Sequence, residues 1–246
     1  MVLTQVSWAG STWGLPLLTV LCPSERYHSE RGRRHQKVTA RARQIVRLLT
    51  RWLPDRPLIF VGDSGFAALE LLHAVSQTPN AHLITRLRLD AELWHLAPKR
   101  KPHQPGRPRV KGARLPSPKQ RLDDPNTLWT TLEVEHGYGS EKREVAIYTE
   151  TCVWYKSGFH SVLMRWVLVR DPQGQYEPQA FLSTCVDHTP AQILSWFVRR
   201  GRMEVTFEEA RVHLGMETQR QGSDLAIART TPVLLGLFSL VALMAG

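Results

Sequence analysis

The segment from Leu58 to Val75 passes from a short apolar run through a turn into a helical pattern. Leu58–Val61 is apolar, Gly62-Asp63-Ser64-Gly65 follows, and later apolar residues recur with helical spacing. This order predicts a strand, a tight turn and a helix. Asp63 is then expected at the carboxyl end of a central strand, where open α/β sheets carry their chemistry.

Other segments continue this alternation of strand and helix. A helix is expected to end near Leu53, and a strand is expected from His82 to Arg88. Further along, β-branched and aromatic residues bounded by turn residues predict four strands, at residues 129–134, 143–155, 162–170 and 179–185. Asp171–Gly174 is typical of a hairpin connection, and Thr189 with Pro190 of a helix start. The fold class indicated is α/β.

Four residues near the end of the chain have a distinctive spacing. Phe197, Arg200, Glu204 and Arg211 read as an aromatic residue, two others, Arg, three others, Glu, six others and a basic residue. On one helix, Arg200, Glu204 and Arg211 would project from a single face. The pattern predicts a carboxylate held among fixed cations. The simpler interpretation of Glu204 is an exposed carboxylate paired with Arg200 four residues earlier.

These residues resemble the insertion-sequence transposases of the DDE superfamily, in the group with a Tyr-x2-Arg-x3-Glu-x6-Lys signature. Phe197 replaces the Tyr and Arg211 replaces the Lys. The resemblance extends over nearly the whole chain, through the segments SERYHSERGRRH, FVGDSGFAALELL, TRLRLDAELW, GRPRVKG and RWVLVRDPQG and through the tail from Glu204 to Leu243. It implies an RNase H-like mixed sheet with flanking helices, interrupted by a mostly β insertion.

The resemblance also implies roles for individual residues. Asp63 and Glu204 would be catalytic ligands of two Mg²⁺ ions, because hard divalent cations prefer carboxylate oxygens. Arg200 and Arg211 would contact DNA phosphates, and Phe197 would stack near a displaced base. Two alternatives stay open from the residues alone: Asp63 as a turn-forming residue and Phe197 as a core aromatic.

The resemblance divides the chain into three parts. Residues 1–90 would form the amino-terminal part of the RNase H-like core, 91–162 a basic linker and β insertion, and 163–246 the carboxyl-terminal part with the signature helix. In the family, the first catalytic Asp lies upstream of the part that matches residues 1–22. We therefore expect an amino-terminally truncated transposase that lacks the first strand and is catalytically impaired.

Charge points to nucleic acid independently of the resemblance. The chain has a formal net charge of +10 and a pI near 10.0. No Asp or Glu interrupts the Lys, Arg and Pro residues from Pro98 to Leu122. Within this segment, Pro105–Arg109 resembles an AT-hook core, although a solvated basic loop explains the same residues equally well. Arg107, Arg109 and Lys111 are expected to contact DNA phosphates.

The remaining sequence features exclude several classes of protein. The three cysteines and ten histidines show no spacing typical of zinc ligands, so we expect thiols in a reducing cytoplasm. No nucleotide-binding motif occurs. The apolar run Val233–Ala245 is shorter than a membrane span and is expected to be a buried helix. The predicted location is the bacterial-type cytoplasm, in association with the nucleoid.

The predicted partners are transposon-end and target DNA, further copies of the chain and a full-length transposase in a mixed oligomer, with no membrane. The main alternative function is a non-catalytic DNA-binding remnant that occupies transposon ends or inhibits a full-length transposase. In a third alternative, the truncated sheet does not fold stably, because an exposed edge and an incomplete core remain.

Overall fold

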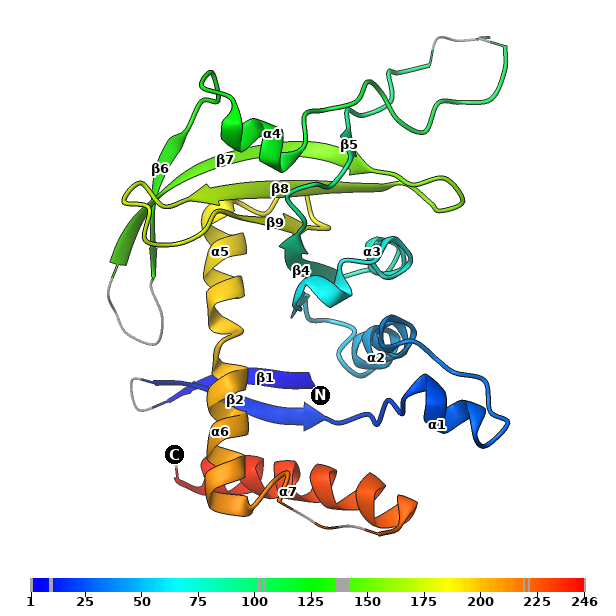
Figure 1. Cartoon of the computed structure of the whole chain (residues 1–246), viewed down its shortest axis with the longest axis vertical. Helices are drawn as coiled ribbons and strands as arrows, with labels where there is room; N and C mark the ends of the chain where they lie inside the picture. Colours follow the sequence, from blue (N-terminus) through cyan, green and yellow to red (C-terminus); the bar gives the residue numbers. More distant parts are fainter. Residues whose placement is uncertain are drawn as a thin grey trace. The chain divides into compact units, whose positions relative to one another are not determined.

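The computed structural model describes residues 2–8, 11–100, 103, 105–135, 142–218, 220 and 222–245. The chain forms two compact units. One comprises residues 38–198, and the other combines residues 1–37 with residues 199–246. Figure 1 labels the elements of both units, and each unit is described by itself below.

A mixed sheet forms the centre of the 38–198 unit. Its strands follow the order β3-β4-β9-β8-β7-β5, and β6 pairs with β7. Only the β3 and β4 pair is parallel; the other described pairs are antiparallel. The strands are β3 (Leu58–Val61), β4 (Ala81–Leu87), β5 (Leu93–Trp94), β6 (Thr130–Glu135), β7 (Lys142–Trp154), β8 (Val162–Arg170) and β9 (Gln179–Ser183).

Helices pack on both faces of this sheet. Strand β8 shows why, because its apolar residues alternate in direction: Met164 and Trp166 join the cluster under α2 (Val38–Trp52) and α3 (Leu69–Ser76). Val167 joins the opposite cluster, under α5 (Pro190–Arg199). A mixed sheet between helices confirms the predicted α/β class and is consistent with an RNase H-like fold. The unit also contains the short helix α4 (Pro118–Asp123).

The predicted central position of the strand before Asp63 is wrong for the described sheet. Strand β3 lies at the end of the strand order and pairs only with β4. An apolar four-residue run can occupy a central or an edge position, since its composition reports burial on both faces and not the number of neighbouring strands. All four residues of β3 are half-buried. Helix packing therefore covers an edge strand here.

The connection between β8 and β9 is the predicted hairpin, and one carboxylate organises it. Both oxygens of Asp171 accept hydrogen bonds from the loop backbone, from the N–H groups of Gln173 at 3.0 Å, Gln175 at 2.6 Å and Tyr176 at 3.2 Å. The Arg143 guanidinium on β7 lies 2.6 Å away, and the Asp171 side chain is only 4% exposed. Burial alone would raise the pKa of Asp171, but these donors outweigh it and hold the pKa below its usual value.

Acid should therefore weaken the unit partly through Asp171. A carboxyl group with a lowered pKa in the folded state stabilises the protein above its unfolded pKa, near 3.9, and loses this contribution as pH falls through the folded value. We expect Asp171→Asn to lower the melting temperature at pH 7 and to reduce the further decrease between pH 5 and pH 3. Thermal melts across this range test it, with the exposed Asp55→Asn as control. Equal acid sensitivity in wild type and Asp171→Asn would contradict this role.

Helix α5 begins where the sequence predicts it. Pro190 is its first residue. The Thr189 hydroxyl accepts a hydrogen bond from the Gln192 N–H at 3.3 Å, and the Gln192 side chain accepts one from the Thr189 N–H at 2.9 Å. This reciprocal capping box satisfies two backbone donors and fixes the start of the helix against β9.

The second unit combines both ends of the chain. Strands β1 (Val2–Trp8) and β2 (Ser11–Leu18) form a two-stranded antiparallel sheet. The helices are α1 (Glu25–Ser29), α6 (Arg202–Leu214) and α7 (Asp224–Ala245). The Thr206 hydroxyl on α6 donates to the Gly14 carbonyl at 2.7 Å, and the Ser239 hydroxyl on α7 donates to the Pro16 carbonyl at 2.9 Å. Thus the first hairpin is held by the last two helices. The division into 1–90, 91–162 and 163–246 stays a prediction.

Helix α7 differs from the expected buried helix. Leu235 and Ala242 are buried, but Val233, Leu240 and Met244 are more than half exposed. Asp224–Met244 is long and apolar enough to cross a membrane by length and composition. Core helices of other proteins meet the same criteria, so one such helix does not identify a membrane protein.

Candidate functional site

Asp63 lies two residues beyond the end of β3, in the predicted turn. Its Oδ1 accepts a hydrogen bond from the Gly65 N–H at 2.9 Å and caps the short 3₁₀ helix Ser64–Phe66. The residue is exposed, and its Oδ2 has no hydrogen-bond partner among the described residues. One carboxylate oxygen is therefore fixed by the turn while the other can bind a ligand. Asp63 acts as a turn former and presents a carboxylate at the same time.

Two neighbours fix the backbone that carries Asp63. The hydroxyl of Thr85, a fully buried residue of β4, donates a short hydrogen bond to the Asp63 carbonyl. Gly62 is required for a steric reason, because a Cβ there would lie 2.9 Å from the Phe66 ring. The role of Thr85 was not predicted from the sequence. Only the register of β3 and β4, which pairs Val61 with Ile84, places Thr85 beside the turn.

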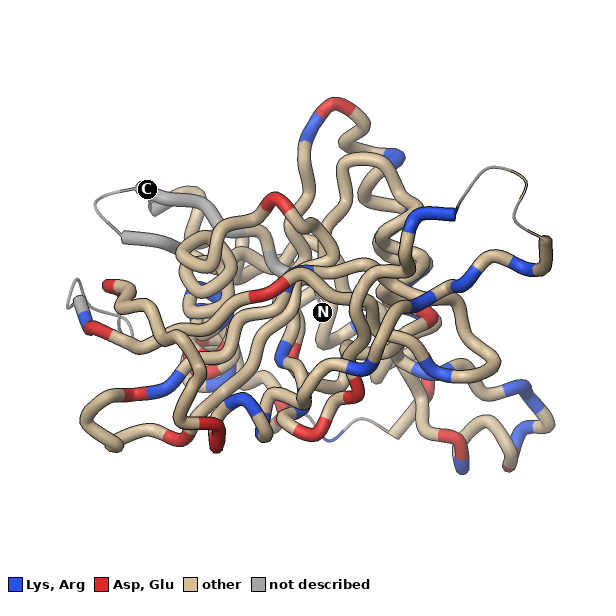
Figure 2. The backbone as a smooth tube through the Cα atoms, turned by 90° about the horizontal axis from the view of Figure 1, so that it is seen from above, with Lys and Arg blue, Asp and Glu red and all other residues tan. Residues whose placement is uncertain are grey.

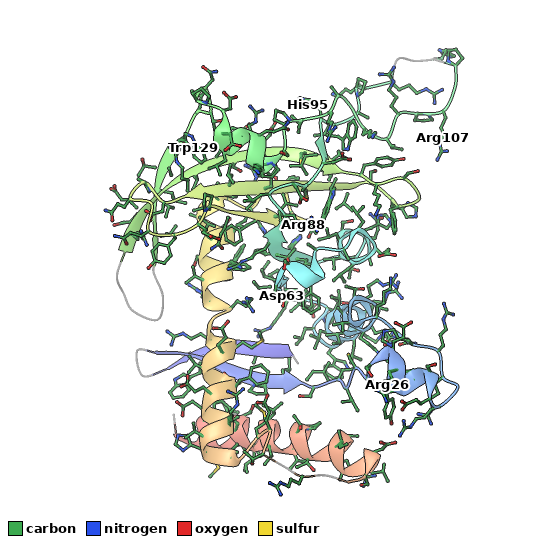
Figure 3. All side chains as sticks on the ribbon, viewed as in Figure 1. Arg26, Asp63, Arg88, His95, Arg107 and Trp129 are labelled. Carbon is green, nitrogen blue, oxygen red and sulfur yellow. The ribbon has the colours of Figure 1, made fainter. Side chains whose placement is uncertain are left out.

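Cations lie at the same end of the sheet. Strands β3 and β4 are parallel, so Arg86 in β4 and Arg88 just after it lie at the end of the sheet that carries Asp63. Figure 3 labels Arg88 and Asp63. The Arg88 guanidinium binds the Asp90 carboxylate through two contacts, of 2.8 and 2.6 Å, and this hydrogen bonding lowers the pKa of Asp90. Arg86 is exposed, and its guanidinium carbon lies 5.4 Å from the centre of the Phe197 ring. This edge combines a carboxylate with basic side chains.

The four spaced residues do not lie on one continuous helix. Helix α5 ends at Arg199, Arg200 and Gly201 form a turn, and α6 begins at Arg202. The expectation of one helical face is wrong for this reason: a Gly provides little helical preference, and the chain changes helix there. Glu204 lies in the first turn of α6, exposed, with Oε1 3.6 Å from the Arg200 guanidinium. The predicted pair between these two residues is therefore present.

The other two residues of the spacing lie in different surroundings. Arg211 is exposed on α6 and contacts Glu217 at 2.9 Å. Phe197 lies on α5 and is only 9% exposed, because it packs into the core between α5 and the sheet. Its ring lies 4.6 Å from that of Phe181. Its proposed stacking on DNA stays a prediction. Asp63 and Phe197 belong to the 38–198 unit, whereas Glu204 belongs to the other unit.

The basic segment is a loop between His95 and Gly112, and hydrogen bonds hold its two ends together at its base. At its base the His95 N–H donates to the Ala113 carbonyl, and the Gly112 N–H donates to the His95 carbonyl, both at 2.8 Å. Only Gly fits at position 112, since a Cβ would lie 2.5 Å from the Leu96 carbonyl oxygen. The Lys111 ammonium lies 3.1 Å from the centre of the Trp94 ring. These contacts attach a polar loop to β5.

Beyond this base the loop presents positive charge to solvent. Arg107 and Arg109 are exposed. Figure 2 shows Lys and Arg along the loop, and Figure 3 labels Arg107 on it. Clustered exposed cations suit salt-sensitive phosphate binding. Lys111 differs from the two arginines, because its charge lies over aromatic rings at the base.

Comparison with known proteins identifies the family. No curated protein matches the chain. A family model described as DDE superfamily endonuclease matches residues 3–152, more than half of the chain, and this stretch contains Asp63 and the basic loop but not Glu204. Domains of this kind generally use divalent metal ions and act on DNA. The exposed carboxylate at the end of β3, the basic edge and the family match agree, and the chain belongs to the DDE superfamily of endonucleases.

Proposed function

We propose that the chain is part of a transposase that acts on the ends of an insertion sequence, with Asp63 and Glu204 as ligands of Mg²⁺. The observation that carries the proposal is the Asp63 carboxylate. It lies inside the family match, follows a sheet strand directly and keeps one oxygen available for a ligand.

The donor set fits a hard cation. Asp63 and Glu204 are both exposed and both offer carboxylate oxygens, which Mg²⁺ prefers. When bound, two such ions can activate the attacking oxygen and stabilise the leaving oxygen of a phosphodiester displacement. The residues of the chain would hold the ions and orient the DNA. Thr85 would keep the Asp63 backbone in place, and Arg200 would hold Glu204.

Phosphate binding would come from basic residues in both units. Arg200 and Arg211 lie on or next to α6, whereas Arg107 and Arg109 lie on the basic loop. Guanidinium groups can bind phosphate oxygens through two parallel hydrogen bonds, so they suit a DNA backbone contact. Transposon ends and target DNA are the proposed ligands.

We propose that this chain binds DNA but cleaves it slowly. Two-metal sites use a carboxylate that bridges both ions. Asp63 and Glu204 are the two acids assigned here, and neither is assigned the bridging position. We therefore propose slow cleavage by the chain alone. The exposed basic loop supports the second candidate function, a DNA-binding remnant that occupies transposon ends or forms mixed oligomers with a full-length transposase.

A conservative substitution tests Asp63. Asn at position 63 keeps an oxygen that can accept the Gly65 hydrogen bond but removes the negative charge, so we expect Mn²⁺ affinity to fall about tenfold or more without loss of stability. Mn²⁺ stands in for Mg²⁺ because its binding is measured directly by electron paramagnetic resonance. The matched control is Asp124→Asn, since Asp124 accepts the same kind of hydrogen bond from the Asn126 N–H at 2.9 Å.

The same proteins distinguish the candidate functions. Slow Mg²⁺-dependent cleavage of insertion-sequence-end DNA that Asp63→Asn abolishes supports the impaired transposase. End-specific binding without cleavage supports the DNA-binding remnant, and reduced activity of an added full-length transposase would support mixed assembly. Equal Mn²⁺ binding by wild type, Asp63→Asn and Asp124→Asn would show that Asp63 is no metal ligand.

A further inference from the structure

Three side chains with nitrogen and sulfur donors converge on the α5 side of the main sheet. His82, Cys185 and His188 each offer one ligand atom, and these atoms all lie within 4.8 Å of one another. All three residues are half-buried. This cluster was not predicted, because no zinc-ligand spacing was expected among the cysteines and histidines. That expectation overlooked Cys185 and His188, which have two residues between them, a spacing that suits a shared metal.

Strand register explains how His82 meets residues about a hundred positions later. Strands β4 and β9 are antiparallel, and Ile84 pairs with Ser183. The pairing continues past the end of β9, because the Thr184 N–H donates to the Leu83 carbonyl at 3.1 Å and the Leu83 N–H donates to the Thr184 hydroxyl at 2.9 Å. The next residues on the two segments are His82 and Cys185. A regular ladder therefore places them opposite each other.

His188 is held by an independent set of contacts. It directly precedes Thr189, whose capping box with Gln192 fixes the start of α5. Its ring contacts Trp196 on α5, with centres 4.8 Å apart, and His82, with centres 5.0 Å apart. The third ligand is thus positioned by the helix start, and the first two by the sheet.

A buried hydroxyl fixes the orientation of the His188 ring. The Ser183 Oγ lies 2.8 Å from His188 Nδ1 and accepts a hydrogen bond from the Cys185 N–H at 3.1 Å. Ser183 is fully buried. Donation from Nδ1–H to Ser183 leaves the Nε2 lone pair available for a metal, and such a partner for the second ring nitrogen is usual for metal-binding histidines.

Burial and a neighbouring carboxylate act on the two histidines in opposite directions. Burial lowers the pKa of both His82 and His188, and the proximity of His82 lowers that of His188 further. The neighbouring Asp187 carboxylate acts in the opposite direction on both, but the net shifts are downward. The exposed Asp187 supplies a carboxylate next to the cluster.

We propose that His82, Cys185 and His188 form a zinc site, with Asp187 or water as the fourth ligand. Zinc accepts imidazole nitrogen at about 2.0 Å and thiolate sulfur at about 2.3 Å, so tetrahedral ligands lie roughly 3.3–3.6 Å apart. Side-chain rotations close the difference from the observed spacing. The Cys185 thiol loses its proton on binding, and that proton is released to solvent.

This site is separate from the Asp63 carboxylate. His82 pairs with Ile59 near the start of β3, whereas Asp63 follows the end of that strand. The donors also differ, since nitrogen and sulfur select zinc and carboxylate oxygens select Mg²⁺. A bound zinc ion would link β4, the segment after β9 and the start of α5. Its role is structural, and it does not depend on the proposed transposase activity.

Metal titration of the full chain tests the site. After removal of metals by a chelator, we expect one Zn²⁺ per chain by calorimetry and a Co²⁺ complex with a sulfur-to-metal charge-transfer band. Cys185→Ser should abolish that band, and His82→Ala or His188→Ala should weaken Zn²⁺ binding at least tenfold. The matched controls are Cys22→Ser and His160→Ala. Cys22 is exposed, and His160 stacks on His73 at 4.2 Å in another histidine pair.

A second measurement uses the wild-type chain and does not depend on the folding of any variant. Zn²⁺ should protect Cys185 from alkylation by iodoacetamide, as measured by mass spectrometry, while Cys22 reacts equally with and without metal. Burial raises the pKa of the Cys152 thiol, so it should react slowly in both samples. Equal alkylation of Cys185 in both samples, or a Co²⁺ band that persists in Cys185→Ser, would overturn the proposal.

Discussion

Replacing Trp166 with alanine should destabilise the 38–198 unit by about 3–5 kcal/mol, a large part of the stability of a typical domain. Trp166 is fully buried at the centre of β8, and its ring lies 5.6 Å from that of Tyr148. Alanine would leave a cavity that the surrounding sheet cannot close, because β7 and β9 fix the backbone on both sides. Urea denaturation followed by circular dichroism measures the effect.

Two further variants separate cavity formation from other causes. Trp52 on α2 is 54% exposed, so Trp52→Ala should change stability much less. Trp166→Phe should also cost less than Trp166→Ala, since it keeps an aromatic ring and removes an indole N–H that has no hydrogen-bond partner among the described residues. If all three variants had the same free energy of unfolding in urea, the core that we describe around β8 would be wrong.

Removing three exposed cations from the basic loop should weaken DNA binding roughly 100-fold near 0.15 M salt. Each phosphate contact contributes about 0.9 to the slope of log K against log salt, which is about fivefold in affinity at that concentration. The triple variant Lys99→Ala, Arg107→Ala, Arg109→Ala should therefore reduce the slope by about 3. Fluorescence anisotropy with labelled duplex DNA over a salt series measures both quantities.

The loop variant has a matched control on another basic segment. Arg26 is strongly exposed but contacts Glu30 at 2.9 Å, so Arg26→Ala removes a paired charge and should leave the salt slope nearly unchanged. An unchanged slope in the triple variant would place the phosphate contacts elsewhere in the chain. Equal slope changes in both variants would indicate a general effect of net charge instead.

Local patterns predicted the elements of the sheet well. Val162–Arg170 was expected as a strand with these bounds, because its alternating apolar residues fit a strand covered on both faces. The turn at Asp63 and the α5 cap were equally predictable from the sequence, since both depend on residues within a few positions of one another. Such features need no knowledge of distant parts of the chain.

Features that depend on strand order and register were missed. No local pattern shows that β3 lies at the edge of the described sheet, or that Thr85 reaches the carbonyl of Asp63. His82 and Cys185 meet because β4 pairs with β9 across about a hundred residues. The helix break at Gly201 was difficult to place for another reason: a low helix propensity at one Gly does not show whether a helix continues or ends there.

The closed base of the basic loop limits where its charges can act. The segment leaves the sheet after Trp94 and returns at Gly112, so about eight residues on each side span at most about 27 Å. A duplex rises about 3.4 Å per base pair, so the loop cations can contact phosphates over less than one helical turn from the sheet. Closure during folding also lowers the entropy lost when the loop binds, compared with a free tail of the same composition. The length of the chain between Trp94 and Gly112 therefore limits the length of DNA that the proposed loop contacts can cover.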